Sequence, residues 1–212
     1  REARGHLLEI LSRAYLLRQR LQSYRFAFAG RPPDLEAGIF LAEGHLKLGE
    51  TEAAVGVYRQ LLALRPDDVD VLTALEALYR RQRRLPEAVA LLKKLAVLQP
   101  RTAREVYQRI ADLLLQLYRD KEALIYAQQA VALGAKDPTT YLRLGELFEK
   151  KEDYAAALQA YGRAKQLDPR RVRTLLALAR LQTLRGDYRG AEQHYRRVLQ
   201  LARTPETLAR AF

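Results

Sequence analysis

The sequence predicts an all-α protein built from a repeated pair of antiparallel helices. Ala123, Ala157 and Ala191 follow one another at a step of 34 residues, and Tyr161 and Tyr195 keep the same step. Each step contains two stretches with apolar residues at helical spacing, separated by a short break. Self-similarity at this period is typical of arrays in which each unit is a pair of helices. We therefore expect about five such units, preceded by further helical residues.

The two ends of the chain are expected to differ from the repeated part. Residues 1–34 are helical in pattern but lack a turn signal before Pro32 and Pro33, so we expect a helical cap or a degenerate repeat. Residues 206–212 are expected to start a further helix, with Pro205 in its first turn. Because the chain has no initiator Met, we expect it to be a piece of a longer protein.

The array itself is expected to cover residues 35–205. In each unit a first helix is followed by a turn and a second helix, so that the apolar stripes of the two helices face each other. The predicted units are 35–68, 69–103, 104–137, 138–171 and 172–205.

Local signals support the boundaries of these helices. Gly49 and Gly186 stand at the break between two helices, where glycine tolerates a positive φ that ends a helix. Asp137 followed by Pro138 is a helix start, because the Asp side chain can accept from free backbone N–H groups and Pro fits the first turn. Pro169 disfavours helical geometry at the residue before it and so ends the second helix of its unit.

Small residues indicate where the paired helices touch. Gly145 in a first helix and Ala157 in the following second helix recur as small residues in other units, which would let two helix backbones approach closely. Larger residues such as Phe148 and Tyr161 would fill the space toward the next unit. The matching small pairs are Ala42/Ala54, Ala111/Ala123 and Ala179/Ala191.

These positions resemble the tetratricopeptide repeat family. The unit 138–171 carries that family's pattern of aromatic, Leu-Gly, aromatic, Ala, aromatic, Ala and Pro at Tyr141, Leu144, Gly145, Phe148, Ala157, Tyr161, Ala164 and Pro169. The unit 35–68 resembles it at Leu41, Ala42, His45, Ala54, Tyr58 and Pro66. The two units between them depart from the pattern at Glu76, Ala111 and Ala127.

The resemblance implies a right-handed α-solenoid whose first helices line a concave groove that binds a protein or peptide segment. The groove positions that it implies in this chain are Glu36, Ile39, Glu43, Asp70, Thr73, Ala77, Glu105, Gln108, Asp112, Thr139, Leu142, Arg143, Glu146, Arg173, Leu176 and Arg180.

Charge is unevenly distributed along the array. The chain has a net charge of +12, yet residues 34–68 are acidic while 138–212 are strongly basic. We therefore expect an acidic stretch of a partner to meet Arg173 and Arg180 at the C-terminal end of the groove. Solvated helix faces with internal ion pairs are the alternative explanation of the same pattern.

Catalytic and metal sites are not expected. The chain has no Cys, and its three histidines, His6, His45 and His194, lack metal-binding helical spacing. Ser12 and Ser23 are its only serines, and neither lies in a nucleophile-elbow motif. We expect no enzymatic activity, no cofactor and no metal. We also expect no membrane insertion, because no apolar run approaches about 18 residues.

The expected function is a protein–protein interaction scaffold within a larger, bacterial protein, in the cytoplasm or the periplasm. One alternative is a nucleic-acid-binding repeat module, since the basic runs 80–84 and 170–173 could contact phosphates. Another is an accessory repeat region of an enzyme, of an envelope polysaccharide-export component or of a secretion component. Self-association through the ends of the array is a further expectation, because an end repeat exposes an apolar face.

Overall fold

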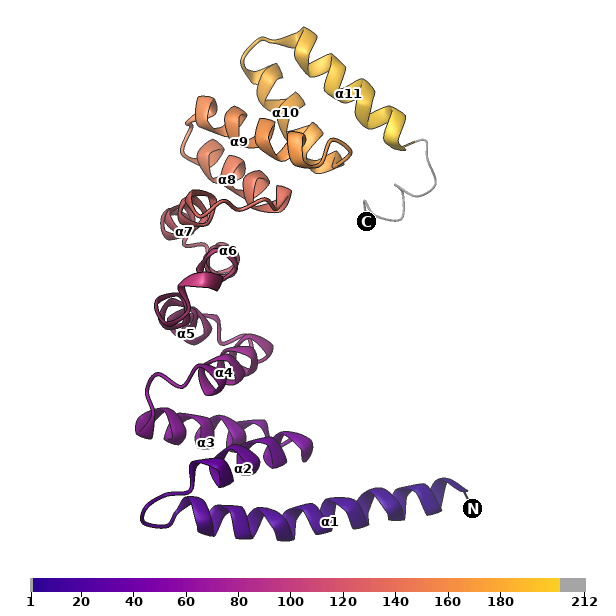
Figure 1. The fold of residues 1–212 in the computed structure, drawn as a ribbon. Coiled ribbons are helices and arrows are strands. Elements are labelled where there is room, and N and C mark those ends of the chain that lie inside the picture. The colour runs from indigo at the N-terminus through magenta and orange to yellow at the C-terminus, as the bar shows by residue number, and fades with distance from the viewer. Residues whose placement is uncertain (1, 203–212) are drawn as a thin grey trace. The chain divides into compact units, whose positions relative to one another are not determined.

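A computed structural model describes residues 2–202 of the chain, with side chains described from Ser12 onward. This range is folded into α-helices and one short 3-10 helix and holds no β-strand (Figure 1). The predicted all-α class is confirmed, whereas the predicted helix over 206–212 lies outside the described residues. The helices are α1 (Glu2–Phe28), α2 (Leu35–Lys47), α3 (Thr51–Leu64), α4 (Val69–Arg81), α5 (Leu85–Leu98), η1 (Pro100–Thr102), α6 (Ala103–Gln116), α7 (Asp120–Ala132), α8 (Pro138–Lys150), α9 (Tyr154–Leu167), α10 (Val172–Leu184) and α11 (Tyr188–Ala202).

The chain divides into two compact units between Leu98 and Gln99. Unit 1 contains α1 to α5, and unit 2 contains η1 and α6 to α11. Within each unit the main contacts join helices that follow one another in sequence, so that α1 packs on α2, α2 on α3, and so on. Five helix pairs result, namely α2–α3, α4–α5, α6–α7, α8–α9 and α10–α11, each joined by a short turn.

A residue with positive φ lies in the turn of each of these five helix pairs. Gly49 and Gly186 adopt φ of 75° and 79°, in agreement with the sequence prediction. The other three turns place Arg83, Tyr118 and Glu152 in the same left-handed region, with φ between 56° and 61°. A side chain in this region costs roughly 1–2 kcal/mol. The turn geometry is therefore common to all five pairs even where glycine is absent.

Aspartates cap the start of five of the described helices. The Asp137 carboxylate accepts from the backbone N–H of Thr140 at 3.1 Å, as its position before Pro138 predicts. Asp34, Asp68, Asp153 and Asp187 accept in the same way from the N–H three residues later. Each cap satisfies a backbone donor that has no partner within its helix.

Glycines bring α1 onto α2 in unit 1. A Cβ added at Gly38 would clash with Phe28 of α1 and with Leu61 of α3, and one added at Gly44 would clash with Leu21 of α1. Leu21 and Phe28 are buried, although most of the side chains described in α1, from Ser12 onward, are exposed. Residues 2–28 thus form one continuous helix that covers the first helix of the next pair.

The core of unit 2 is centred on Tyr161 of α9, which is fully buried. A Cβ at Gly145 of α8 would overlap its ring, so glycine is needed for the ring to reach this position. The cluster around Tyr161 also contains Ala157 and extends to Leu178 and Leu181 of α10. The contact between α8 and α9 predicted from the small residues is therefore present, and it continues to the next helix pair.

Candidate functional site

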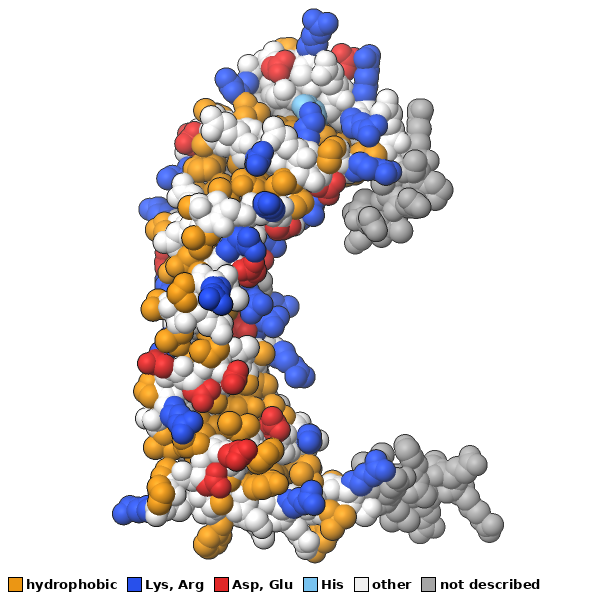
Figure 2. All heavy atoms as spheres, viewed as in Figure 1, with side chains coloured by type: hydrophobic (Ala, Val, Ile, Leu, Met, Phe, Trp, Pro, Cys, Tyr) orange, Lys and Arg blue, Asp and Glu red, His pale blue; other side chains and the backbone are white. Residues whose placement is uncertain are grey.

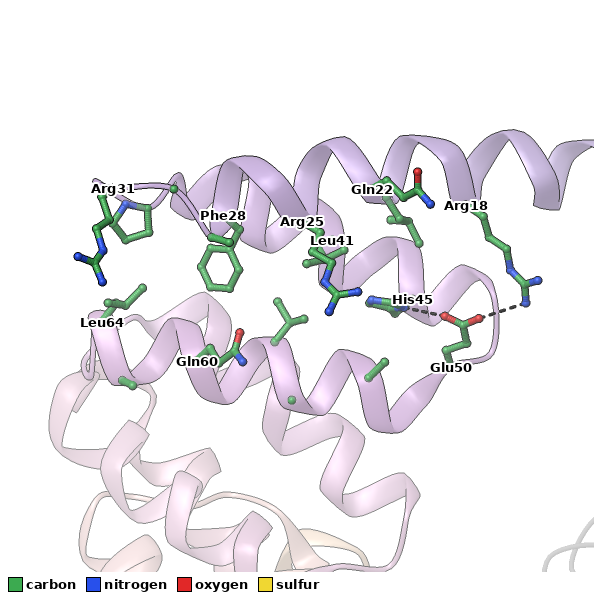
Figure 3. Close-up of a pocket in the computed structure, with 18 residues that line it drawn as sticks. Arg18, Gln22, Arg25, Phe28, Arg31, Leu41, His45, Glu50, Gln60 and Leu64 are labelled. Atoms are coloured by element: carbon green, nitrogen blue, oxygen red, sulfur yellow. Dashed lines mark hydrogen bonds and ion pairs between the residues drawn. The ribbon is translucent and has the colours of Figure 1, made fainter.

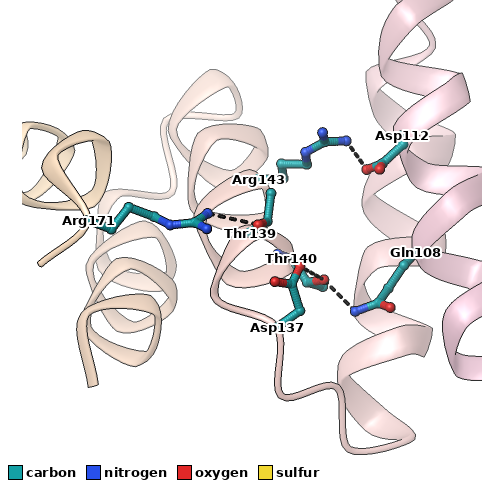
Figure 4. A network of polar contacts seen from close by, with 7 residues as sticks. All are labelled: Gln108, Asp112, Asp137, Thr139, Thr140, Arg143 and Arg171. Atoms are coloured by element: carbon teal, nitrogen blue, oxygen red, sulfur yellow. Dashed lines mark hydrogen bonds and ion pairs between the residues drawn. The ribbon is translucent and has the colours of Figure 1, made fainter. Parts of the chain in front are cut away.

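Polar contacts join the first helices of unit 2 to one another (Figure 4). From α6, Gln108 donates through Nε2 to the Thr140 hydroxyl of α8 at 2.6 Å. Asp112 of α6 forms an ion pair with Arg143 of α8. One helix further, Arg171 donates through Nη1 to the Thr139 hydroxyl at 2.8 Å. The three helices α6, α8 and α10 are thus connected along one side.

Two ion pairs between α8 and α10 extend this row. Arg173 Nη2 lies 3.2 Å from Oε1 of Glu146, and Arg180 Nη2 lies 2.9 Å from a Glu149 oxygen. The Tyr161 hydroxyl of α9 also donates to Glu149, at 2.8 Å. Glu149 therefore connects the buried core to the exposed row.

We call the surface that carries these contacts the first-helix face. Most of its partners lie about one repeat apart in sequence, because each contact joins equivalent positions of successive helix pairs. Along α8 its members follow at i, i+4 and i+7, which places them on one side of the helix. The face consists of Gln108, Asp112, Thr139, Thr140, Arg143, Glu146, Glu149, Arg171, Arg173 and Arg180.

A hollow of about 300 Å³ lies at the end of this face, between α6 and the start of α8. Its acidic lining residues are Glu105, Asp112 and Asp137, and Arg109 adds one basic group. Acidic and basic side chains lie next to one another over α6 and α8 (Figure 2), in agreement with the Asp112–Arg143 pair. The hollow has a carboxylate-rich lining that suits a cationic group.

The environment shifts the pKa of several groups on and below the face. Burial lowers the pKa of the half-buried Arg143 guanidinium, and the nearby charge of Arg173 lowers it further while Glu146 opposes the change. Burial also raises the pKa of the Tyr161 phenol, and its hydrogen bond to Glu149 adds to the effect. Tyr161 therefore stays a neutral hydrogen-bond donor to the Glu149 carboxylate.

The structure brings seven of the predicted groove residues into this row of contacts. Glu105 lines the hollow, and Leu176 is exposed on α10. In unit 1, Glu36, Glu43, Asp70 and Thr73 are exposed on α2 and α4, while Ile39 and Ala77 are half-buried. The seven are Gln108, Asp112, Thr139, Arg143, Glu146, Arg173 and Arg180.

Leu142 is a correction to the predicted set. Its side chain is only 2% exposed and belongs to the cluster that contains Tyr161 and Leu178. The first helix of a pair packs against its own second helix and also against the following pair, so its buried stripe is wider than a single helix–helix contact predicts. Leu142 lies in the part of the stripe that faces α10.

Sequence reasoning missed the role of Glu149. Its carboxylate accepts from both Tyr161 and Arg180. Its spacing of three residues from Glu146 is the one signal in the sequence, because it places both carboxylates on the same side of α8.

Both basic runs are engaged in contacts with neighbouring residues. In the first run, Arg80 pairs with Glu76 at 3.3 Å, and Arg84 pairs with Glu87 at 2.9 Å while lying over the Tyr79 ring. In the second, Arg171 contacts both Asp168 and Thr139. These arginines therefore connect helices and turns within the chain.

The described residues contain no group of three or more His, Cys, Asp or Glu side chains placed to hold a metal ion. His45 Nδ1 lies 2.7 Å from Glu50, and His194 lies between Gln182 and Lys165. No described helix is both long and apolar enough to cross a membrane.

Family models identify the repeated unit. Models of the tetratricopeptide repeat match residues 39–70, 138–171 and 174–209. The chain is a tetratricopeptide repeat protein. The matched residues contain most of the pairs α2–α3, α8–α9 and α10–α11, so the α8 and α10 parts of the first-helix face lie in tetratricopeptide repeats.

Solved structures show the same fold. MamA from Desulfovibrio magneticus is 21% identical and aligns with a TM-score of 0.64, over 81% of this chain and 96% of that one. YrrB, described as a tetratricopeptide repeat protein with an unusual peptide-binding site, is 17% identical with a TM-score of 0.65. This alignment covers 90% of this chain and 98% of YrrB.

A relative from Homo sapiens is much longer than the chain. The protein O-mannosyl-transferase TMTC1 is 29% identical over 134 residues, which are 63% of this chain and 15% of that protein. The chain thus corresponds to a small part of this relative. The tetratricopeptide repeats and their structural neighbours support a protein–protein interaction scaffold for protein or peptide partners.

Proposed function

We propose that unit 2 binds a segment of a partner protein along the first-helix face. The observation that carries this proposal is the row of contacts across α6, α8 and α10, which aligns seven predicted groove residues on one surface. A surface fixed by contacts between its own helices needs little reordering when a partner binds, and this lowers the cost of binding.

The partner is proposed to carry charge of both signs. Arg173 and Arg180 each contact one carboxylate, yet 77% and 61% of their side chains remain exposed. Arginine has five donors, so a partner carboxylate can bind each guanidinium beside the existing pair. At the other end, a Lys or Arg of the partner would enter the acidic hollow beside Glu105 and Asp112.

Binding rather than catalysis is the function proposed for this chain, as part of a larger protein. Tetratricopeptide repeats typically serve as non-catalytic scaffolds, and YrrB offers a case of the same fold with a peptide-binding site. The groove residues predicted on α2 and α4 of unit 1 remain part of the proposal as a second stretch of binding surface.

A photo-crosslinking experiment tests the proposal. A benzophenone amino acid replaces Leu176, which is 41% exposed on α10, or Leu199, which is 62% exposed on α11. We expect a crosslinked partner from position 176 alone, identified by mass spectrometry of the crosslinked peptide. Equal crosslinking from both positions would contradict a site on the first-helix face.

Charge reversal then tests the roles of the two arginines. In the variant Arg173→Glu/Arg180→Glu, we expect crosslinking to the identified partner to fall about fivefold or more, because like charges replace the proposed pairs. The control Arg163→Glu/Arg197→Glu makes the same charge change on α9 and α11, where each arginine contacts a glutamine three residues later. Undiminished crosslinking in the first variant would remove the arginines from the site.

A further inference from the structure

A hollow larger than the one on unit 2 lies in unit 1, where α1 packs against the pair α2–α3 (Figure 3). It is a groove of about 1060 Å³ between α1 and α3, and α2 forms its floor. We call it the α1–α3 groove. Both walls pack on α2, and the glycines at positions 38 and 44 hold α1 close to that helix. The groove is therefore a fixed feature of the packing in unit 1.

One face of α1 forms the first wall. Arg18, Gln22 and Arg25 follow at i, i+4 and i+7, which places them on one side of the helix. The helical part of the wall, from Arg18 to Phe28, is about 15 Å long at 1.5 Å per residue, so it matches roughly three turns of a helix.

The second wall and the floor are mostly apolar, with Gln60 and His45 as their polar residues. On α3 the groove is lined by the exposed small residues Ala53, Gly56 and Ala63, followed by Leu64. A Cβ added at Gly56 would meet no atom within 4 Å, so the space above this glycine is open. Buried side chains close the bottom of the groove, namely Leu41, Val57 and Phe28.

Positive charge lies along the groove. Its basic lining residues are Arg18, Arg25 and Arg31, and its one carboxylate is Glu50. Glu50 already contacts both Arg18 and His45, at 3.2 and 2.7 Å. Within the described residues neither Arg25 nor Arg31 makes a side-chain hydrogen bond or ion pair. Figure 3 shows Arg25 reaching from α1 into the groove, and Arg31 beside Leu64 at the other end.

We propose that the α1–α3 groove binds an amphipathic helix of a partner protein, about three turns long and acidic on its flank. The small side chains of α3 leave room for the partner's apolar face, in the manner of a helix laid into a groove. Arg25 and Arg31 bind carboxylates on its flank. A second copy of this chain fits poorly, because its net charge of +12 would oppose these arginines. This surface is separate from the first-helix face of unit 2.

Selection from a random library of 14-residue peptides displayed on phage, with the intact chain immobilised, tests this proposal. We expect enriched peptides to combine a helical apolar stripe with an excess of Asp and Glu. Two variants locate the binding, measured with the enriched peptides by fluorescence polarisation. Gly56→Leu fills the groove, and Arg25→Glu reverses its charge. We expect each to weaken binding at least tenfold.

Matched control variants show whether a loss of binding comes from the groove or from the type of substitution alone. Gly162→Leu makes the same change at a glycine of α9 whose Cβ would also meet no atom within 4 Å. Arg59→Glu makes the same charge change on α3, outside the groove lining. Both controls should bind as the parent chain does, and circular dichroism verifies the helical content of all four variants.

Three outcomes overturn the proposal. They are the absence of any enriched peptide, enrichment of neutral or basic peptides, and binding that survives Gly56→Leu and Arg25→Glu. Displacement of the bound peptides by a single-stranded oligonucleotide, with the same dependence on Arg25, would assign the groove to nucleic acid instead. Because the variants lie in unit 1, a negative result for the α1–α3 groove would not contradict the site proposed on unit 2.

Discussion

At the scale of the residue, the packing of Tyr161 explains why Gly145 cannot be replaced. The ring is fully buried, and its hydroxyl is fixed by the bond to Glu149 at 2.8 Å. A Cβ at Gly145 would overlap that ring, which has no free space to move into. Glycine is therefore required here by contact with a neighbouring helix, although its own backbone is helical.

Gly145→Ala is predicted to lower the free energy of unfolding by about 1–3 kcal/mol, because overpacking outweighs the better helix propensity of alanine. The control Gly162→Ala has open space around its Cβ, and we expect it to raise stability by up to about 1 kcal/mol. Urea denaturation of both variants measures the difference. Equal stability of the two would contradict the close contact between Gly145 and Tyr161.

Single residues show which site features the sequence could predict. The helix start at Asp137 could be predicted, because an Asp side chain caps a helix and Pro138 after it fits the first turn. The burial of Leu142 could not, because it depends on how α10 packs against α8. The pairing of Arg180 with Glu149 likewise could be seen only in the structure, because the two residues are 31 positions apart in the sequence.

At the scale of the element, every helix pair closes with the same turn whichever residue occupies it. Gly49 and Gly186 were predicted because glycine is the residue that favours positive φ. Arg83, Tyr118 and Glu152 carry no such signal, and their conformation is imposed by the two helices that they join. The repeat period thus predicted the position of these turns, whereas residue type predicted only two of them.

Tyr118→Gly is predicted to stabilise the chain by about 0.5–1 kcal/mol, because it removes the strain of a side chain at positive φ. Tyr118 is 90% exposed, so little apolar burial is lost. The reverse change Gly186→Ala should destabilise by a similar amount, since its φ is 79°. Thermal melting monitored by circular dichroism compares the two variants, and a lower melting temperature for Tyr118→Gly would contradict the prediction.

At the scale of the whole molecule, the main contacts join helices that are neighbours in sequence. Stability in such an array is approximately a sum of local terms, so a defect in one pair affects its neighbours first. This property follows from the repeat period alone, and for that reason the fold class was predictable. The division between Leu98 and Gln99 was not predicted, because the repeat period treats all units alike.

Ala157→Leu is predicted to overpack the contact between α8 and α9, where Ala157 is fully buried, at a cost of roughly 1–3 kcal/mol. Hydrogen exchange should rise most in α8, α9 and α10, and least in α1 to α3, because opening is local in an array of this kind. A uniform rise in exchange over residues 2–202 would show that the chain opens as a single cooperative body instead.

The row of polar side chains across α6, α8 and α10 has a consequence for how such a protein can change over time. The Arg173 and Arg180 side chains remain mostly exposed, while the Tyr161 cluster beneath them is sealed. Substitutions can therefore change the exposed charges, and with them the partner that is bound, without disturbing the packing of the core. Partner specificity and stability therefore depend on different residues of the same helices, and each can change without the other.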